Sequence, residues 1–104
     1  MIEKLNLFYT TCGKITEAED LAKKMIGANF ASCINIIKDI KSFYKENSKI
    51  NSTNEIVLII KTVKQFEEME VYLNNNHPYG TPFIGELNMN KINSKYLEWI
   101  SKNL

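Results

Sequence analysis

Three side chains of this sequence could bind a soft or borderline metal ion: Cys12, Cys33 and His77. They are all the thiols and imidazoles that the chain has, since it contains two cysteines and one histidine. They form no local pair of the C-x-x-C or H-x-x-x-H kind, so a closed zinc site within one chain is not expected. A metal site would have to join residues that are distant in the sequence, or residues from more than one copy.

The same residues give little support for enzyme chemistry. A nucleophilic enzyme needs a nucleophile beside an oriented base, and His77 is the sole imidazole available to Cys12 or Cys33. No G-x-S-x-G motif is present, and the four glycines are scattered, so neither a P-loop nor a dinucleotide fingerprint exists. We predict that the protein is not an enzyme and binds no nucleotide by the standard motifs.

Each candidate ligand also has a structural interpretation. Cys33 lies in a β-rich stretch, where alternation puts it on the same side as Ala31 and Asn35, and a free cysteine in such a strand usually packs as a small apolar residue. Cys12 is expected in the loop after the first strand. His77 precedes a proline and can end a helix, although a neutral imidazole there could also bind Cu²⁺ or Zn²⁺ with carboxylates from another copy.

Composition excludes several classes of partner. The 104 residues carry a net charge of +1, with 13 basic and 12 acidic side chains and no basic cluster, so nucleic acid is not an expected partner. The longest apolar run, Ile56–Ile60, is too short to span a membrane. The N-terminus lacks the hydrophobic region of a signal peptide, and two cysteines suit free thiols, so we expect a cytoplasmic protein with one domain over residues 1–104.

The first third of the chain predicts a strand followed by a helix. Alternating side chains indicate a strand over residues 4–11, which Gly13 ends. Thr16 to Glu19 has the pattern of a capping box, in which the two side chains satisfy backbone amides at a helix start. Apolar residues then recur at helical spacing over about three turns: Ala18, Leu21, Ala22, Met25 and Ile26.

The middle of the chain predicts a long β-hairpin. Residues 31–43 are rich in β-branched side chains, residues 46–49 favour a turn, and residues 54–63 form the second strand. We expect this hairpin to exceed the usual strand length.

The last third predicts a helix, a strand and a short terminal helix. Thr62 to Gln65 has a second capping-box pattern, and His77-Pro78 ends the helix that follows. A strand is expected over residues 82–89, and Asn93 or Ser94 should cap the terminal helix.

This order of elements predicts an α+β fold: a ferredoxin-like βαββαβ sandwich with an extended central hairpin and a C-terminal helix. The two helices cover one face of the sheet. Ile34, Ile36 and the Ile56–Ile60 run indicate burial on both faces of the middle strands. One chain has too few helices for that, so we expect identical copies to pack sheet against sheet.

Four blocks of the sequence, in order and at matching spacing, resemble the CutA family over nearly the whole chain. Each is short, but together they are specific. The blocks are Ala18–Ala22 leading to Ala31–Ile36, Ser42–Tyr44 with Lys49-Ile50, Glu55 and Leu58–Thr62, His77-Pro78-Tyr79 with Phe83-Ile84, and Tyr96–Ile100.

The resemblance implies a PII-like homotrimer whose long hairpins pair across subunit boundaries, linked to divalent-cation tolerance and copper binding. It also makes Cys33 and His77 candidate ligands for copper or another divalent ion, which would be bound weakly. The chain departs from the family pattern at four positions. Glu46 and Ser48 replace a tryptophan and a glycine near the hairpin tip, and Gly80 and Phe83 replace polar or acidic residues.

Four residues of these blocks stand at positions that the family retains: Tyr44, Glu55, Lys61 and Trp99. In a trimer they could line a cleft between subunits. Alternatively, Glu55 and Lys61 form an interface ion pair and Trp99 anchors the terminal helix on a neighbour. Two other functions therefore stay open: a PII-like sensor with a small molecule in this cleft, and a trimeric platform for partner proteins.

Overall fold

The computed structural model describes residues 4–103 and contains four strands and three helices within that range. In chain order they are β1 (Asn6–Cys12), α1 (Ile15–Gly27), β2 (Cys33–Glu46), β3 (Lys49–Thr62), α2 (Phe66–Asn76), β4 (Gly85–Leu87) and α3 (Ser94–Lys102). This is the predicted βαββαβ order followed by a C-terminal helix, so the predicted α+β ferredoxin-like fold is confirmed.

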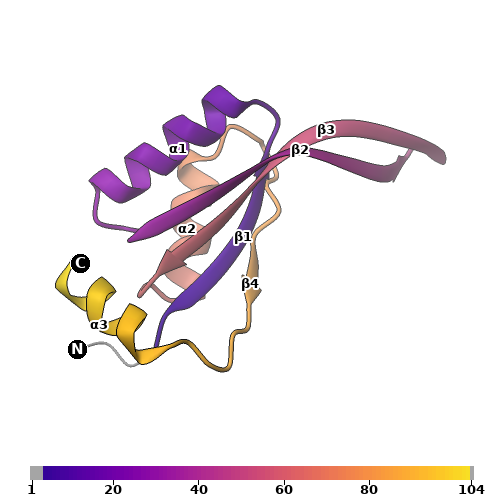
Figure 1. The fold of residues 1–104 in the computed structure, drawn as a ribbon. Coiled ribbons are helices and arrows are strands. Elements are labelled where there is room, and N and C mark those ends of the chain that lie inside the picture. The colour runs from indigo at the N-terminus through magenta and orange to yellow at the C-terminus, as the bar shows by residue number, and fades with distance from the viewer. Residues whose placement is uncertain (1–3, 104) are drawn as a thin grey trace.

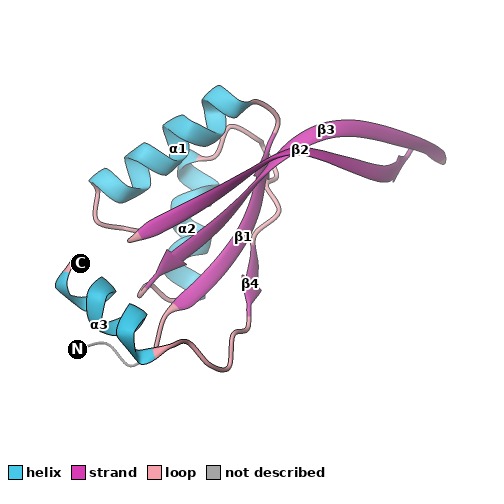
Figure 2. Ribbon diagram, in the orientation of Figure 1, coloured by secondary structure: helices cyan, strands magenta, loops and turns pink. Residues whose placement is uncertain are grey.

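The strands form one antiparallel sheet in the order β2-β3-β1-β4. Helices α1 and α2 pack on one face of this sheet, while α3 lies beside the start of β1 and the end of β3 (Figure 1). Figure 2 shows that β2 and β3 run together well beyond the rest of the sheet as a two-stranded arm. No helix in residues 4–103 is long and apolar enough to cross a membrane.

The core lies between the sheet and the two helices. Phe8 is opposite Ile60 in the β1–β3 register, and both side chains are completely buried. Met25 of α1 and Met69 of α2 close the core from the helical side, each at 0% exposure. Burying each such side chain contributes about 1.5–3 kcal/mol of transfer free energy, so this layer dominates the stability of the subunit.

Both predicted capping boxes were wrong. Helix α1 begins at Ile15, because only Gly13 and an extended Lys14 separate it from β1, so Thr16 lies inside the first turn and cannot cap it. Thr62 still belongs to β3, where its hydroxyl donates to the Phe30 carbonyl at 2.6 Å. Helix α2 starts one turn later: the Gln65 backbone amide donates to the Glu68 carboxylate at 3.2 Å.

The hairpin is longer than predicted, and β4 is shorter. Each strand of the hairpin has 14 residues, and the turn between them is only Asn47-Ser48. Both turn residues have positive φ, 52° and 64°, as a two-residue type I′ turn requires. Strand β4 covers three of the eight predicted residues, since it pairs with β1 only from Leu87 to Gly85.

A bulge divides the hairpin into two parts. The β2–β3 register shifts between Ile37 and Ile40, and Asp39 within the shift has a φ of 61°. We call residues 40–55 the ribbon, and the rest of the described chain the body. No residue from 32 to 55 is fully buried, so the ribbon has no core of its own.

Candidate functional site at the base of the hairpin

A cluster of polar side chains lies where the ribbon leaves the body. It contains Cys12 at the end of β1, His77 at the end of α2, Tyr79 in the following loop, and Glu55 on β3. His77 Nε2 is 3.8 Å from Cys12 Sγ and 2.7 Å from the Thr11 carbonyl oxygen. The Tyr79 hydroxyl donates to Glu55 Oε2 at 3.0 Å.

His77 is held by hydrogen bonds at both ring nitrogens. The Tyr79 backbone amide donates to Nδ1 at 3.0 Å, so Nδ1 carries a lone pair and the ring proton is on Nε2. That Nε2–H donates to the Thr11 carbonyl. Burial lowers the pKa of His77, although the Thr11 hydrogen bond and the Glu17 carboxylate act in the opposite direction. The imidazole is therefore neutral and already fully used by the protein.

Cys12 is a protonated, inert thiol. Its side chain has 0% exposure, and the sequence prediction that it lies in a loop was wrong because β1 extends through it. Burial raises the pKa of the Cys12 thiol from 9.0 to about 11, and the carboxylates of Glu17 and Glu55 add to this. Thiolates, not thiols, are nucleophiles and metal ligands, so the neighbourhood of His77 does not activate Cys12.

Glu55 and Tyr79 form the exposed side of the cluster. Burial alone would raise the pKa of Glu55, but hydrogen bonds from the side chains of Ser42, Tyr79 and Thr11 outweigh it, so this pKa is lowered. Burial and the hydrogen bond to Glu55 raise the pKa of Tyr79 to about 12. The pair is thus a carboxylate accepting from a neutral phenol.

This arrangement fits neither thiol–histidine catalysis nor a resident metal ion. A base must accept the proton of the nucleophile, but the nitrogen nearest Cys12 is itself a donor. A metal at Nδ1 or Nε2 would displace one of the two hydrogen bonds that hold the ring. In addition, no group of three or more His, Cys, Asp or Glu side chains in residues 4–103 could hold a metal. The geometry of this cluster therefore gives no support to thiol–histidine catalysis, and both ring nitrogens of His77 are engaged in hydrogen bonds within the protein.

The other predicted ligand, Cys33, lies elsewhere. It starts β2 opposite Lys61 and is half-buried. Alternation along β3 puts Lys61 on the sheet face away from α1 and α2, since its neighbour Ile60 points into the core. One subunit therefore does not bring Cys33 and His77 together.

The four predicted cleft residues are also divided between two places. Glu55 belongs to the cluster described above, and Tyr44 lies further out on the ribbon. Lys61 and Trp99 are at the opposite end of β3, where Lys61 Nζ lies 5.2 Å from the ring centre of Tyr96, and the Tyr96 and Trp99 rings are 5.7 Å apart. A cleft that uses all four residues would need more than one copy.

Sequence reasoning missed the roles of Cys12 and Tyr79 in this cluster. The Cys12–His77 contact joins residues 65 positions apart, and no periodicity within either segment predicts such a contact. Tyr79 was noted only as part of the His-Pro-Tyr motif. That motif could have indicated the contact, because the backbone amide of a residue two positions after a histidine can donate a hydrogen bond to a nitrogen of the histidine ring.

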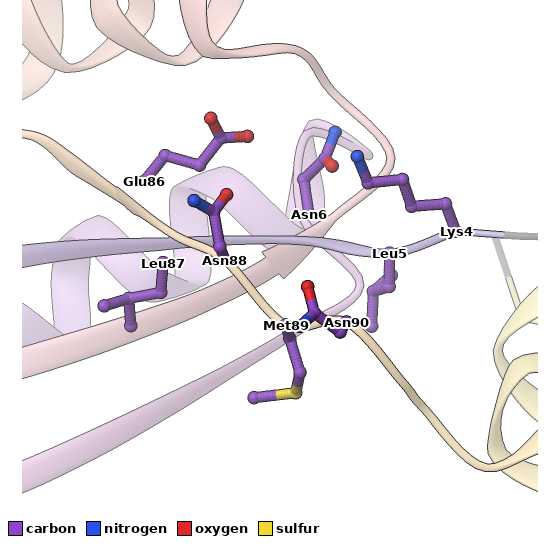
Figure 3. Close-up of a pocket in the computed structure, with 8 residues that line it drawn as sticks. All are labelled: Lys4, Leu5, Asn6, Glu86, Leu87, Asn88, Met89 and Asn90. Atoms are coloured by element: carbon purple, nitrogen blue, oxygen red, sulfur yellow. The ribbon is translucent and has the colours of Figure 1, made fainter.

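A separate hollow of about 380 Å³ lies beside the start of β1 and the end of β4. In Figure 3, Lys4, Asn6 and Glu86 extend to one side of the backbone, while Leu87 and Met89 point to the other. The hollow contains amide groups and one charge of each sign, but no thiol or imidazole. It therefore adds nothing to the predicted metal chemistry.

Comparisons with known proteins agree on one family. The model of the family described as CutA1 divalent ion tolerance protein matches residues 6–103. The divalent-cation tolerance protein CutA of Archaeoglobus fulgidus is 32% identical over 100 residues, which cover 95% of this chain and 97% of that protein. The structure of CutA from Synechococcus elongatus superimposes with a TM-score of 0.87 at 30% identity, over 98% of this chain and 93% of that one.

Relatives differ in length. The CutA homologue of Xenopus laevis is 31% identical over 97 residues, which are 92% of this chain but 64% of that protein. The region shared with this chain is thus less than two thirds of the Xenopus relative.

Proposed function

This chain belongs to the CutA1 divalent ion tolerance protein family, and from that premise we propose that it acts as a homotrimer in the response to divalent metal ions. The trimer is the assembly that the family resemblance implies. A closed ring of three copies would use two different surfaces of each subunit, because such a ring forms by head-to-tail contacts.

The observation that carries this proposal is the uncovered ribbon. Phe43 and Ile50 are 69% and 81% exposed, and Ile37 on the open sheet face is 42% exposed. A two-stranded hairpin is marginally stable alone in water, and contiguous exposed apolar side chains mark interaction surfaces. Burying these groups between copies gives both a reason for the length of the hairpin and a driving force for assembly.

We further propose that copper or another divalent ion binds weakly, at a site shared between subunits. Cys33 is the candidate ligand, because it is half-buried on the face that a second copy would cover. His77 is unsuited, because both of its nitrogens are engaged. A cytoplasmic location is part of the proposal, since both cysteines are free thiols and reducing compartments maintain that state.

Light scattering after size exclusion tests the assembly. We expect a mass three times the 12.0 kDa of the subunit at micromolar concentration. A stable, compact monomer in dilute neutral buffer would refute the proposal.

Calorimetric titration with Cu²⁺ tests the metal site. We expect weak binding that Cys33→Ser abolishes and that His77→Gln leaves largely intact. Equal binding by the wild type and both variants would contradict the assignment of Cys33.

One observation favours a PII-like sensor as a second candidate. Lys61 places its ammonium group over Tyr96, beside a Trp99 that is 53% exposed, which is a suitable lining for an anionic ligand between subunits. A thermal-shift screen separates the functions: stabilisation by Cu²⁺ supports metal response, and stabilisation by anionic metabolites supports a sensor. If neither has an effect, the third alternative, a platform for partner proteins, is favoured.

A further inference from the structure

The ribbon begins at Glu55. Strand β1 supports β3 from Thr62 to Ile56, where its last pair is formed with Cys12. Glu55 is the next residue outward, and it pairs with Ile40, the first residue of β2 beyond the bulge. From this point to the tip, each strand of the ribbon has only the other strand as a neighbour within the sheet.

Such a ribbon needs an anchor to keep its direction. A bulge bends and twists a hairpin locally, and a two-stranded segment without a core has little resistance to further bending. The Glu55 carboxylate is well placed to supply that anchor. It accepts from Tyr79, and its lowered pKa also reflects hydrogen bonds from Ser42 of β2 and Thr11 of β1.

Tyr79 is in turn oriented by the body. Its backbone amide donates to His77 Nδ1 at 3.0 Å, and the same ring donates from Nε2 to the Thr11 carbonyl at 2.7 Å. The Tyr79 hydroxyl also packs against Gly13, because a Cβ atom placed on Gly13 would be 3.2 Å from the hydroxyl oxygen. A continuous set of hydrogen bonds therefore runs from β1 through His77 and Tyr79 to Glu55.

We propose that Tyr79 is a positioning residue for the hairpin: aimed by His77, its hydroxyl clamps Glu55 where β3 leaves the sheet and fixes the direction in which the ribbon is presented. The clamp itself is a property of one subunit. Its consequence for assembly rests on the proposed function, because the ribbon is the surface offered to a neighbouring copy.

Hydrogen exchange with mass spectrometry tests the clamp through Tyr79→Phe, which removes the hydroxyl and keeps both the ring and the backbone amide. We expect amides of residues 40–54 to exchange about tenfold faster, while those of residues 6–12 are unchanged. Tyr72→Phe is the matched control, because Tyr72 stacks on Phe30 at 4.5 Å, away from the ribbon, and should leave ribbon exchange unaltered. Unchanged exchange in Tyr79→Phe, or equal acceleration in β1, would overturn the proposal.

A double variant tests whether Tyr79 acts through Glu55. If it does, Tyr79→Phe combined with Glu55→Ala, which leaves no acceptor for the Tyr79 hydroxyl, accelerates ribbon exchange no more than Glu55→Ala alone. Additive acceleration by the two changes would show that Tyr79 acts through another contact.

The same variants separate this inference from the proposed function. Light scattering of the wild type alone decides whether the trimer exists. If it exists, Tyr79→Phe should raise the concentration at which it dissociates by about tenfold; an unchanged dissociation concentration would show that the clamp does not serve assembly. If the wild type is monomeric, the trimer proposal fails, and the exchange comparison still decides whether the clamp exists.

Discussion

The body and the ribbon share the two long strands β2 and β3, yet the side chains of these strands differ between the two regions in what they contact. Where β3 crosses the body, Leu58 and Ile60 are fully buried under α1 and α2. Where it continues into the ribbon, Ile50 is 81% exposed, and no side chain of residues 40–55 is buried. One strand therefore serves two purposes, and the change takes place within the few residues around Glu55.

The comparison shows that the length of a strand does not determine how much each part of it contributes to the stability of the subunit. The body is stabilised by its own core, whereas the ribbon depends on its connection to the body and, under our proposal, on a neighbouring copy. Substitutions in the two regions should therefore change different measured quantities.

The largest expected effect is on the body. Leu58→Ala removes a fully buried side chain and should lower the free energy of unfolding by about 2–5 kcal/mol. Chemical denaturation measures this, with Ile50→Ala as the matched control for a truncated apolar side chain in the same strand. A loss of similar size in Ile50→Ala within a monomeric state would show that the ribbon is part of the core.

The next effect concerns the ribbon. Replacing Phe43 and Ile50 by serine should weaken self-association about 30-fold to 700-fold, because each exposed apolar side chain loses burial worth roughly 1–2 kcal/mol at an interface. Light scattering across a dilution series measures the change, and circular dichroism should show an intact subunit. Unchanged association would place the contact surface elsewhere.

Alkaline pH should weaken the body and its junction with the ribbon. In the folded state the pKa of Cys12 is raised from 9.0 to about 11 and that of Tyr79 from 10.0 to about 12, so both groups keep their protons to higher pH than in the unfolded chain. The stability that these two raised pKa values contribute is complete below about pH 9 and is lost as the pH rises toward about 12. Denaturation midpoints at several pH values measure the loss, and the Cys12→Ala, Tyr79→Phe variant should show a flatter dependence than the wild type.

The body could be predicted well from the sequence, and the ribbon less well, for a physical reason. Apolar spacing identified the interiors of α1 and α2, because a buried face must repeat with the period of its element. Ribbon residues such as Asn51 and Thr53 face no core, so they show no such period, and the sequence placed the second strand at 54–63 when it begins at Lys49. Helix starts were also missed, since Thr16 and Thr62 fit the capping pattern without being at the helix boundary.

The site could be predicted only in part. The His-Pro stop correctly placed His77 at the end of α2. Its partners Cys12 and Thr11 come from β1, and Glu55 comes from β3, so the cluster exists only once the sheet and the α2–β4 loop are assembled. Spacing along the chain contains no information on such contacts, and the residues predicted as one group, Cys33 and His77, are separated by the sheet.

A smaller effect is expected from a buried hydroxyl group in the body that lacks a hydrogen-bond partner among the described residues. The Thr10 hydroxyl is fully buried and has no hydrogen-bond partner among the described residues, so Thr10→Val should stabilise the subunit by about 1 kcal/mol. Thr62→Val is the contrasting control, because the Thr62 hydroxyl donates to Phe30 and accepts from the Lys64 amide at 3.0 Å. Thermal or urea unfolding should move in opposite directions for the two variants; destabilisation by both would mean that Thr10 has an unseen partner.

The smallest effect concerns the ribbon tip, at Ser48. Its φ of 64° is a conformation that costs a residue with a Cβ energy and that glycine adopts freely. Ser48→Gly should therefore stabilise the turn by about 0.5–1 kcal/mol, because glycine is preferred at this position of a type I′ turn. Ser52→Gly is the matched control on the same ribbon: Ser52 pairs with Phe43 in a regular strand, where glycine should instead cost about 0.5–1 kcal/mol. Hydrogen exchange of the ribbon amides distinguishes the two variants. Slower exchange in Ser48→Gly together with faster exchange in Ser52→Gly would locate the strain at the tip. Faster exchange in both would show that the turn does not require a positive φ.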